Sequence, residues 1–379
     1  MRPASRRNPI QSPTSTDPTD RADANKIQGC DLHARQQSIA LLDTETGELI
    51  ERSLEHGAEE PREFYSSLSG PVVVGIEASG AMQWFLQLME ELEIECRVGH
   101  PAKIRAAETR KQKHDRRDAL LLLQLLLEKR FPGIWMPTTE QRDIRTLLRD
   151  RHQWVRMRTR VQSTLQAIAF NHGLRKGKGL WTHAGIAALQ GLPLPRYTTQ
   201  RRNELLRLYI QLRKRIEELN RQVDQVIERH PQAQRLLTHP GVGPVTALAT
   251  EVFLGDPHRF ADGKAVASYI GMIPSEYSSG TRQRFGQLSK QGNGLLRYLW
   301  CEAAMHAVNK DGELRRFYRR KLVKKGMGKA RVAAARKLGI RLWIMLRDEI
   351  DYQEFCRRRR QEGEVLAGMP DRNNGPAVQ

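Results

Sequence analysis

The run Pro71–Ile76 is the feature that most limits how this chain can fold. It reads Pro-Val-Val-Val-Gly-Ile, and a short apolar run rich in β-branched residues is typical of a strand covered on both faces. Glu77 follows it directly. A carboxylate at such a position is costly to bury unless it is bound or paired. The run therefore predicts a buried strand of an α/β sheet that carries an acid at its end.

The segments around this strand predict a mixed sheet with helices on both faces. Before residue 71 the pattern indicates a three-stranded meander, and after residue 77 it indicates alternating helices and strands. We expect this α/β domain to span residues 26–136. Residues 1–25 lack an apolar segment and are expected to form a disordered tail. The expected strands are 27–33, 38–43, 48–54 and 95–98, and the expected helices are 81–92 and two that begin near 101 and 116.

The remainder of the chain is expected to be mainly helical. Residues 137–230 should form a helical or coiled-coil segment that turns at residues 191–195, residues 231–355 a second globular unit, and residues 356–379 a disordered tail. One apolar stripe predicts either a helical hairpin or coiled coil, or equally an ordinary bundle helix. It comprises Leu205, Leu208, Leu212, Ile216, Leu219, Val223 and Val226.

The second unit opens with a pattern typical of a helix-hairpin-helix. Residues 236–247 combine an apolar helix, the turn Gly241-Val242-Gly243 and a second helix with Pro244 at its start. Glycines at such a turn allow backbone N–H groups to approach a phosphate. A plain helix-capping turn explains the same residues equally well.

The charge of the chain indicates a phosphate-rich partner. Its 63 Lys and Arg against 43 Asp and Glu give a net charge of +20, which favours nucleic acid. Residues 315–347 alone carry thirteen Lys and Arg and no acid, so Arg319 and Lys324 are expected to meet phosphates, with Lys290 and Arg297 extending that surface. The longest apolar run, 119–127, is too short to cross a membrane. We therefore expect no membrane partner.

Cysteine and histidine patterns exclude several kinds of site. The four cysteines form no C-x-x-C pair, and the eleven histidines form no H-E-x-x-H motif. A zinc ribbon and a disulfide framework are therefore disfavoured, and a reducing cytoplasm is expected. Any bound metal should be held by carboxylates, which favours Mg²⁺ or Mn²⁺.

Four carboxylates of the first domain are candidates for such a metal site. Asp31 lies in the first expected strand and Glu77 ends the buried one, and ligands collect at the carboxyl ends of strands in open α/β sheets. Asp115 and Asp118 are three residues apart, on one face of an expected helix. Divalent ions held in this way activate the attacking oxygen and neutralise the leaving one in phosphoryl transfer. Except for Glu77, each acid taken alone is more commonly a surface charge.

A serine in the second unit is a candidate nucleophile. Ser279 lies in the segment Tyr-Ser-Ser-Gly-Thr-Arg-Gln-Arg together with Arg282 and Arg284, whose guanidinium groups can hold a phosphodiester. The alternative is a simple Ser-Gly turn. No histidine is adjacent, so the hydroxyl would need activation by metal or by another group.

In combination and in order, these motifs resemble the DEDD transposases of the one-ten class of bacterial insertion sequences. The acidic motifs lie at residues 29–33, 75–78 and 113–119, and the second unit contributes 240–247, 269–274, 278–280 and 289–297. The resemblance implies an N-terminal RuvC-like (RNase H-like) domain, a coiled-coil segment and a C-terminal transposase domain. His114 and Ala34 depart from the commoner residues, and neither removes a carboxylate.

The same resemblance implies an activity and its partners. Asp31, Glu77, Asp115 and Asp118 would bind divalent metal, and Ser279 would form a transient covalent link to DNA. Donor and target DNA, a structured guide RNA and further copies of the chain, as a dimer or tetramer, would be the partners. A nucleoid-associated cytoplasmic recombinase is therefore expected. The alternatives are a Holliday-junction-type endonuclease without a serine intermediate, and a non-catalytic nucleic-acid-binding protein from a decayed element.

Overall fold

The structure is a computed structural model, and it divides the chain into two compact units between Met136 and Pro137. No helix in the described part of the chain is long and apolar enough to cross a membrane. The structure describes residues 24–57, 59–108, 115–276 and 284–367.

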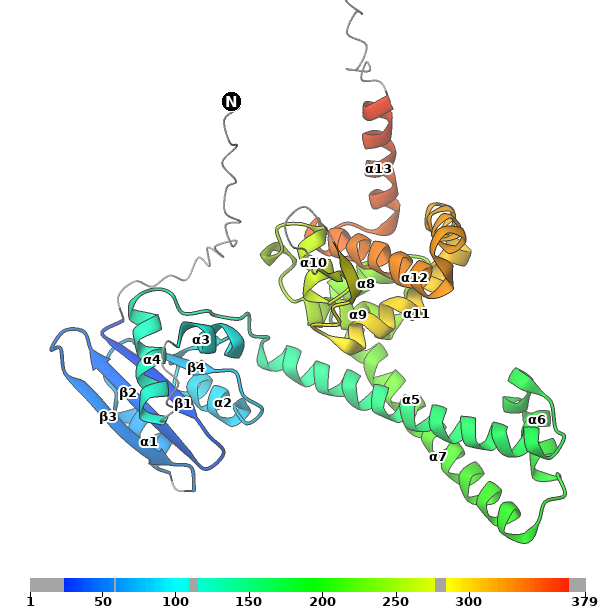
Figure 1. Ribbon diagram of the computed structural model, residues 1–379, viewed down its shortest axis with the longest axis horizontal. Coiled ribbons are helices and arrows are strands. Elements are labelled where there is room, and N and C mark those ends of the chain that lie inside the picture. The colour runs from blue at the N-terminus through cyan, green and yellow to red at the C-terminus, as the bar shows by residue number, and fades with distance from the viewer. Residues whose placement is uncertain (1–23, 58, 109–114, 277–283, 368–379) are drawn as a thin grey trace, which may run out of the picture. The chain divides into compact units, whose positions relative to one another are not determined.

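The first unit contains a five-stranded sheet with helices on both faces (Figure 1). The strand order is β3-β2-β1-β4-β5, in which β1, β2 and β3 are antiparallel and β4 and β5 run parallel to β1. This confirms the predicted RuvC-like mixed sheet. The elements are β1 (Lys26–Leu32), β2 (Gln36–Asp43), β3 (Leu49–Glu55), α1 (Glu60–Ser67), β4 (Val72–Glu77), α2 (Gln83–Glu91), β5 (Glu95–Gly99), α3 (Pro101–Ala107) and α4 (Asp115–Leu127).

The two faces of this sheet have different cores because strand side chains alternate between faces. On one face Cys30, Val74 and Ile76 pack with Tyr65 of α1 and Phe85 of α2. On the other face α4 lies across β1 and β2 (Figure 1), and Ala119 and Leu123 pack against Ala40. Since β4 is covered on both faces, its apolar composition has a direct physical cause.

The second unit begins with a long helical hairpin. α5 (Thr139–Asn171) and α7 (Arg196–Ile227) pack side by side, and η1 (Gly177–Trp181) and α6 (His183–Gln190) form the connection at their far end (Figure 1). α5 begins with a reciprocal cap, because the Thr138 hydroxyl accepts from the Gln141 N–H and the Gln141 side chain accepts from the Thr138 N–H.

The buried stripe of α7 differs from the predicted one at both ends. Leu206 and Tyr209 are buried, whereas Leu208 is 41% exposed, and Ile227 replaces Val226 as the last buried residue. The middle of the stripe is as predicted. The difference arises because α7 is apolar on two adjacent faces, and the partners decide which face is covered: the Trp181 ring packs on Tyr209 at 5.1 Å.

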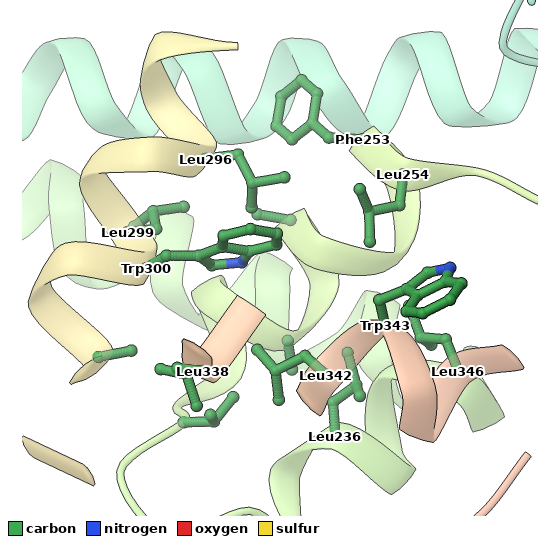
Figure 2. Packing of buried hydrophobic residues seen from close by; sticks show 14 of the residues in the cluster. Leu236, Phe253, Leu254, Leu296, Leu299, Trp300, Leu338, Leu342, Trp343 and Leu346 are labelled. Carbon is green, nitrogen blue, oxygen red and sulfur yellow. The ribbon is translucent and has the colours of Figure 1, made fainter. Parts of the chain in front are cut away.

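The rest of the second unit is a helical body with one large core. Figure 2 shows Trp300 and Trp343 in this core among leucines from several helices. Both indoles are satisfied, since Trp300 Nε1 donates to Thr250 Oγ1 at 2.9 Å and Trp343 Nε1 donates to the Pro257 carbonyl at 2.8 Å. The elements are α8 (Pro231–Leu237), α9 (Pro244–Leu254), η2 (Pro257–Arg259), α10 (Gly263–Tyr269), β6 (Pro274–Glu276), β7 (Phe285–Leu288), α11 (Gly294–Lys310), α12 (Gly312–Arg347) and α13 (Tyr352–Ala367).

Two features of this body depart from the sequence expectations. Residues Ile144, Leu148 and Val223 of the hairpin belong to the same core as α8–α12, so the hairpin and the body are packed together. The expected tail from residue 356 is helical as far as Ala367, because α13 is anchored by Phe355, which is 3% exposed in the same core.

Candidate active site

The sheet brings Asp31 and Glu77 to the same level. Cys30 of β1 pairs with Ile76 of the parallel strand β4, so the next residue of each strand is Asp31 and Glu77. Both side chains are partly buried. The register of β1 and β4 therefore places these two acids side by side at the ends of neighbouring strands.

Close glycine contacts show which face these two acids share. A Cβ atom on Gly29 would collide with the backbone of Ala119 and would lie 2.5 Å from the Leu123 nitrogen, both in α4. A Cβ on Gly75 would lie 2.7 Å from Leu126 Cδ1. Asp31 and Glu77 each follow one of these glycines by two residues, so they point to the face that α4 covers.

The helix α4 supplies the other two predicted acids. Asp118 is partly buried and directly precedes Ala119, the residue that contacts Gly29. Asp115 is the first residue of α4, and its side chain lies outside the described residues. Among the side chains that the structure describes, no three His, Cys, Asp or Glu gather closely enough to hold a metal ion. The structure thus places Asp31 and Glu77 on one face of the sheet and Asp118 in the helix that covers this face.

A residue that the sequence reasoning did not single out lies beside Asp31. The His33 Nε2 atom is 3.1 Å from Asp31 Oδ2, and the His33 side chain is 46% exposed. The expected strand 27–33 contains both residues, and residues i and i+2 of a strand share a face, so this spacing was the signal that could have identified the contact; in the structure β1 ends at Leu32. An imidazole there is positioned to orient the carboxylate or to move a proton.

The predicted serine segment lies between two short strands of the second unit. β6 and β7 pair antiparallel, and the Ser275 hydroxyl donates to the Gln287 carbonyl at 2.9 Å. Ser279 and Arg282 lie outside the described residues, and Arg284 is exposed. The structure therefore describes the strands that carry this segment and leaves its chemistry a prediction.

Next to these strands, the backbone at the end of α10 contacts the backbone of the loop before α11. A Cβ on Gly271 or on Gly292 would collide with the backbone of Gln291 or of Tyr269, respectively. Both glycines also have positive φ, at 71° and 97°. Arg297 Nη1 donates to the Ile270 carbonyl at 2.7 Å, so Arg297 stabilises this contact from within the protein. These close contacts account for the glycines in two of the predicted motifs, residues 269–274 and 289–297.

The two glycines of the helix-hairpin-helix pattern have different surroundings. Gly241 has φ of 91°, and a Cβ there would collide with the backbone of Ala307 in α11. Gly243 is exposed and would meet nothing within 4 Å. Gly241 therefore allows the turn before α9 to pack against α11. Gly243, at the start of α9, has space around it for a phosphate.

The basic surface predicted on α12 is exposed where the helix breaks. Arg319 and Lys324 are exposed, and Gly326 interrupts α12 with φ 74° and ψ 170°. Lys290, in the loop before α11, is exposed as well. Beyond Gly326 the cations are partly engaged, as with Lys337, whose Nζ lies 2.6 Å from Glu313 Oε1. The exposed cations that could meet phosphates thus lie mainly before the break.

Comparison with known proteins points to one family for both units. A DEDD transposase family model, described as "Transposase", matches residues 28–169, and the model of the "Transposase IS116/IS110/IS902 family" matches residues 233–319. The first of these ranges contains all four candidate acids, and the second contains Ser279.

Curated relatives extend the likeness over most of the chain. A "Probable family 20 transposase" of Pseudomonas aeruginosa is 28% identical over 77% of this chain and 88% of its own length. The "Transposase for insertion sequence element IS1111A" of Coxiella burnetii is 26% identical over 76% of this chain and 81% of its own length. Together with the mixed sheet, the acids at its strand ends and the helical second unit, these matches show that the chain belongs to the IS116/IS110/IS902 transposase family, of the DEDD type.

Proposed function

We propose that this transposase cuts and rejoins DNA with divalent metal held by Asp31, Glu77, Asp115 and Asp118. The observation that carries the proposal is the shared face of Asp31 and Glu77 under α4, with Asp118 next to the contact at Gly29. Carboxylate oxygens suit Mg²⁺ or Mn²⁺. A metal bound there would polarise a phosphoryl oxygen and neutralise charge on the leaving oxygen.

The protein side chains would prepare this site in defined ways. Asp31 is held against His33 at 3.1 Å, which orients its carboxylate and lets the imidazole accept or return a proton. Glu77 is fixed by strand pairing with Gly99 of β5. Asp118 is fixed by the packing of α4 on β1. Rigid strands and one packed helix are suitable supports for a site that must position a phosphodiester.

We further propose Ser279 as the nucleophile of strand transfer. Its Oγ would bond to phosphorus as the bond from phosphorus to the leaving deoxyribose oxygen breaks, while the serine proton passes to a base. One phosphodiester link is retained in this step, so rejoining needs no external energy, whereas attack by water would lose the link. Arg284, which is exposed beside β7, would hold the phosphate oxygens.

The metal proposal is tested with Asp118→Ala and a control on the other end of α4. Asp118→Ala should abolish strand cleavage in Mg²⁺ while leaving DNA binding nearly intact. Glu128→Ala, which removes an exposed acid bonded to Gln124 and Arg130, should cleave normally. Full cleavage by the Asp118 variant would exclude this acid from the site.

The serine proposal is tested with trapped intermediates. A suicide substrate nicked near the cleavage point should leave DNA covalently attached to the wild-type chain and not to Ser279→Ala. Mixing Ser279→Ala with Asp118→Ala chains then asks whether one chain or two supply the residues: recovery of activity requires two. Joining of strands by Ser279→Ala alone would eliminate the serine mechanism.

We also propose that a structured RNA guides this transposase to its target. It is supported by the net charge of +20 and by exposed cations on α12 in addition to those near the serine segment. Protein purified from its host should carry an RNA that ribonuclease removes, and its removal should abolish target selection. Site-specific joining by RNA-free protein would contradict this part alone.

A further inference from the structure

The outer part of the helical hairpin is strongly basic. Residues 151–203, which cover most of α5, the connection and the start of α7, contain ten Lys and Arg and no Asp or Glu. Three of these cations, Arg175, Lys176 and Lys178, fall within four residues at the tip. Arg202 is buried and Arg151 donates to Asn220, and the other cations still leave an excess of positive charge that attracts a polyanion.

Two aromatic side chains are exposed at the same tip. Phe170, near the end of α5, is 61% exposed, and Tyr197, at the start of α7, is 77% exposed. An arginine lies over each ring: the Arg175 guanidinium carbon is 5.3 Å from the Phe170 centroid, and that of Arg196 is 5.7 Å from the Tyr197 centroid. Each ring is therefore paired with a cation and still offers open area.

The exposure of these rings is not due to a poorly packed tip. Leu180 and Leu189 are 1% and 0% exposed beneath it, and a Cβ on Gly185 would collide with the backbone of η1. The buried Arg202 donates to the carbonyls of Leu189 and Leu192 at 3.1 and 2.9 Å. The tip therefore has a packed core of its own, and Phe170 and Tyr197 are exposed on the surface of this core.

We propose that this tip binds unpaired nucleotides of a nucleic-acid strand. Exposed bases would stack on Phe170 and Tyr197, while Arg175, Lys176 and Lys178 would contact the flanking phosphates. Duplex DNA would satisfy the cations alone, because base pairs inside a duplex cover each other's faces and leave none for the rings. Stacking on protein aromatics is the common means of holding single strands.

This inference rests on the proposed function only in assuming a nucleic-acid substrate, and binding can be measured without cleavage. The full-length protein is titrated into fluorescein-labelled single-stranded DNA, single-stranded RNA and duplex DNA of equal length, with fluorescence anisotropy as the readout. The test variant is Phe170→Ala with Tyr197→Ala. The matched control is Leu208→Ala, which removes a residue 41% exposed on α7 outside the tip.

The double variant should bind at least one single strand on the order of tenfold more weakly, given the usual strength of base stacking on aromatic residues. Duplex binding should be unchanged, and the control should match wild type. Which strand loses affinity distinguishes a ribose from a deoxyribose ligand. A strand carrying 5-iodouracil should photocrosslink to the peptide of Phe170 or Tyr197.

Three results would overturn the proposal: unchanged single-strand binding, an equal loss for the duplex, or a change in oligomeric state by light scattering, which would make the tip a protein interface. The Asp118→Ala variant separates this proposal from the proposed metal-dependent cleavage. It should bind single strands as the wild type does, even if the wild type turns out not to cleave DNA.

Discussion

The carbonyl oxygen of Ala119 in α4 occupies the space that a side chain on Gly29 in β1 would need. This contact seats the helix that carries Asp118 directly on the strand that carries Asp31. The spacing of the candidate acids is therefore set by a backbone-to-backbone contact that only glycine allows.

Gly29→Ala should loosen α4 from the sheet. Overpacking of a close contact costs about 1–3 kcal/mol, and hydrogen exchange of the α4 amides should become faster than in wild type. Metal-dependent cleavage should fall with it. The control Gly80→Ala adds a methyl group where nothing lies within 4 Å, so protection of α4 should be retained. Equal protection in both variants would show that the contact is not needed.

Asp311 and Arg341 should form a strongly coupled pair. Their side chains are both 3% exposed and in contact, and Tyr352 also donates to Asp311 at 2.9 Å. Arg341→Met would leave a buried carboxylate unpaired and should cost about 3–5 kcal/mol in urea unfolding. Adding Asp311→Asn should restore part of this loss. Additive costs in the double-mutant cycle would contradict the coupling.

His239 should make the second unit sensitive to mild acid. Burial lowers the pKa of His239 from 6.5 to about 4, with Arg341 acting in the same direction, although the hydrogen bond to the Pro240 carbonyl opposes it. Because the unfolded chain takes up this proton first, stability is full above about pH 6.5 and falls by roughly 3 kcal/mol as the pH drops to about 4. His239→Gln should remove this component from the pH profile of urea unfolding. An unchanged profile would assign the acid sensitivity to other groups.

Gly241 and Gly243 should respond differently to the same substitution. Gly241→Ala places a methyl group against α11 at positive φ, so the thermal unfolding temperature should fall. Gly243→Ala is sterically open and has φ of −104°, so the protein should remain stable. If the N–H groups at the start of α9 contact a phosphate, Gly243→Ala should weaken DNA binding in an electrophoretic shift assay. Normal binding would favour the plain capping turn.

The salt dependence of binding to duplex DNA should report on α12. Arg319→Ala with Lys324→Ala should lower the slope of log affinity against log salt by about 0.9 for each phosphate that the two side chains neutralise in the wild type. The control is Arg357→Ala, because Arg357 is already engaged by both carboxylate oxygens of Glu354. An unchanged slope in the double variant would show that this part of α12 does not touch the DNA backbone.

The sequence by itself determined the strands of the first unit, the acids in two of them and the mainly helical character of the second unit, whereas β6 and β7 were not predicted. Each of these features depends on residues that are close in sequence. The residues before Glu77 in the run Val72–Glu77 are apolar over the length of a strand. The turn after β2 is stabilised by Asp43, whose carboxylate accepts from the Glu45 and Thr46 N–H groups. α1 was not predicted, since its short segment buries only Pro61 and Tyr65 and so shows little periodicity.

Only the tertiary structure decided which faces meet. The buried stripe of α7 depends on Trp181 packing on Tyr209, the roles of Gly29 and Gly241 depend on helices that are distant in sequence, and α13 extends the fold because Phe355 is buried in a core built from α8 to α12. The side chains of Ser279 and Asp115 lie outside the described residues, so their roles remain sequence predictions. Contacts between distant residues are invisible to local pattern, because burial on one face is a property of the partner as much as of the segment itself.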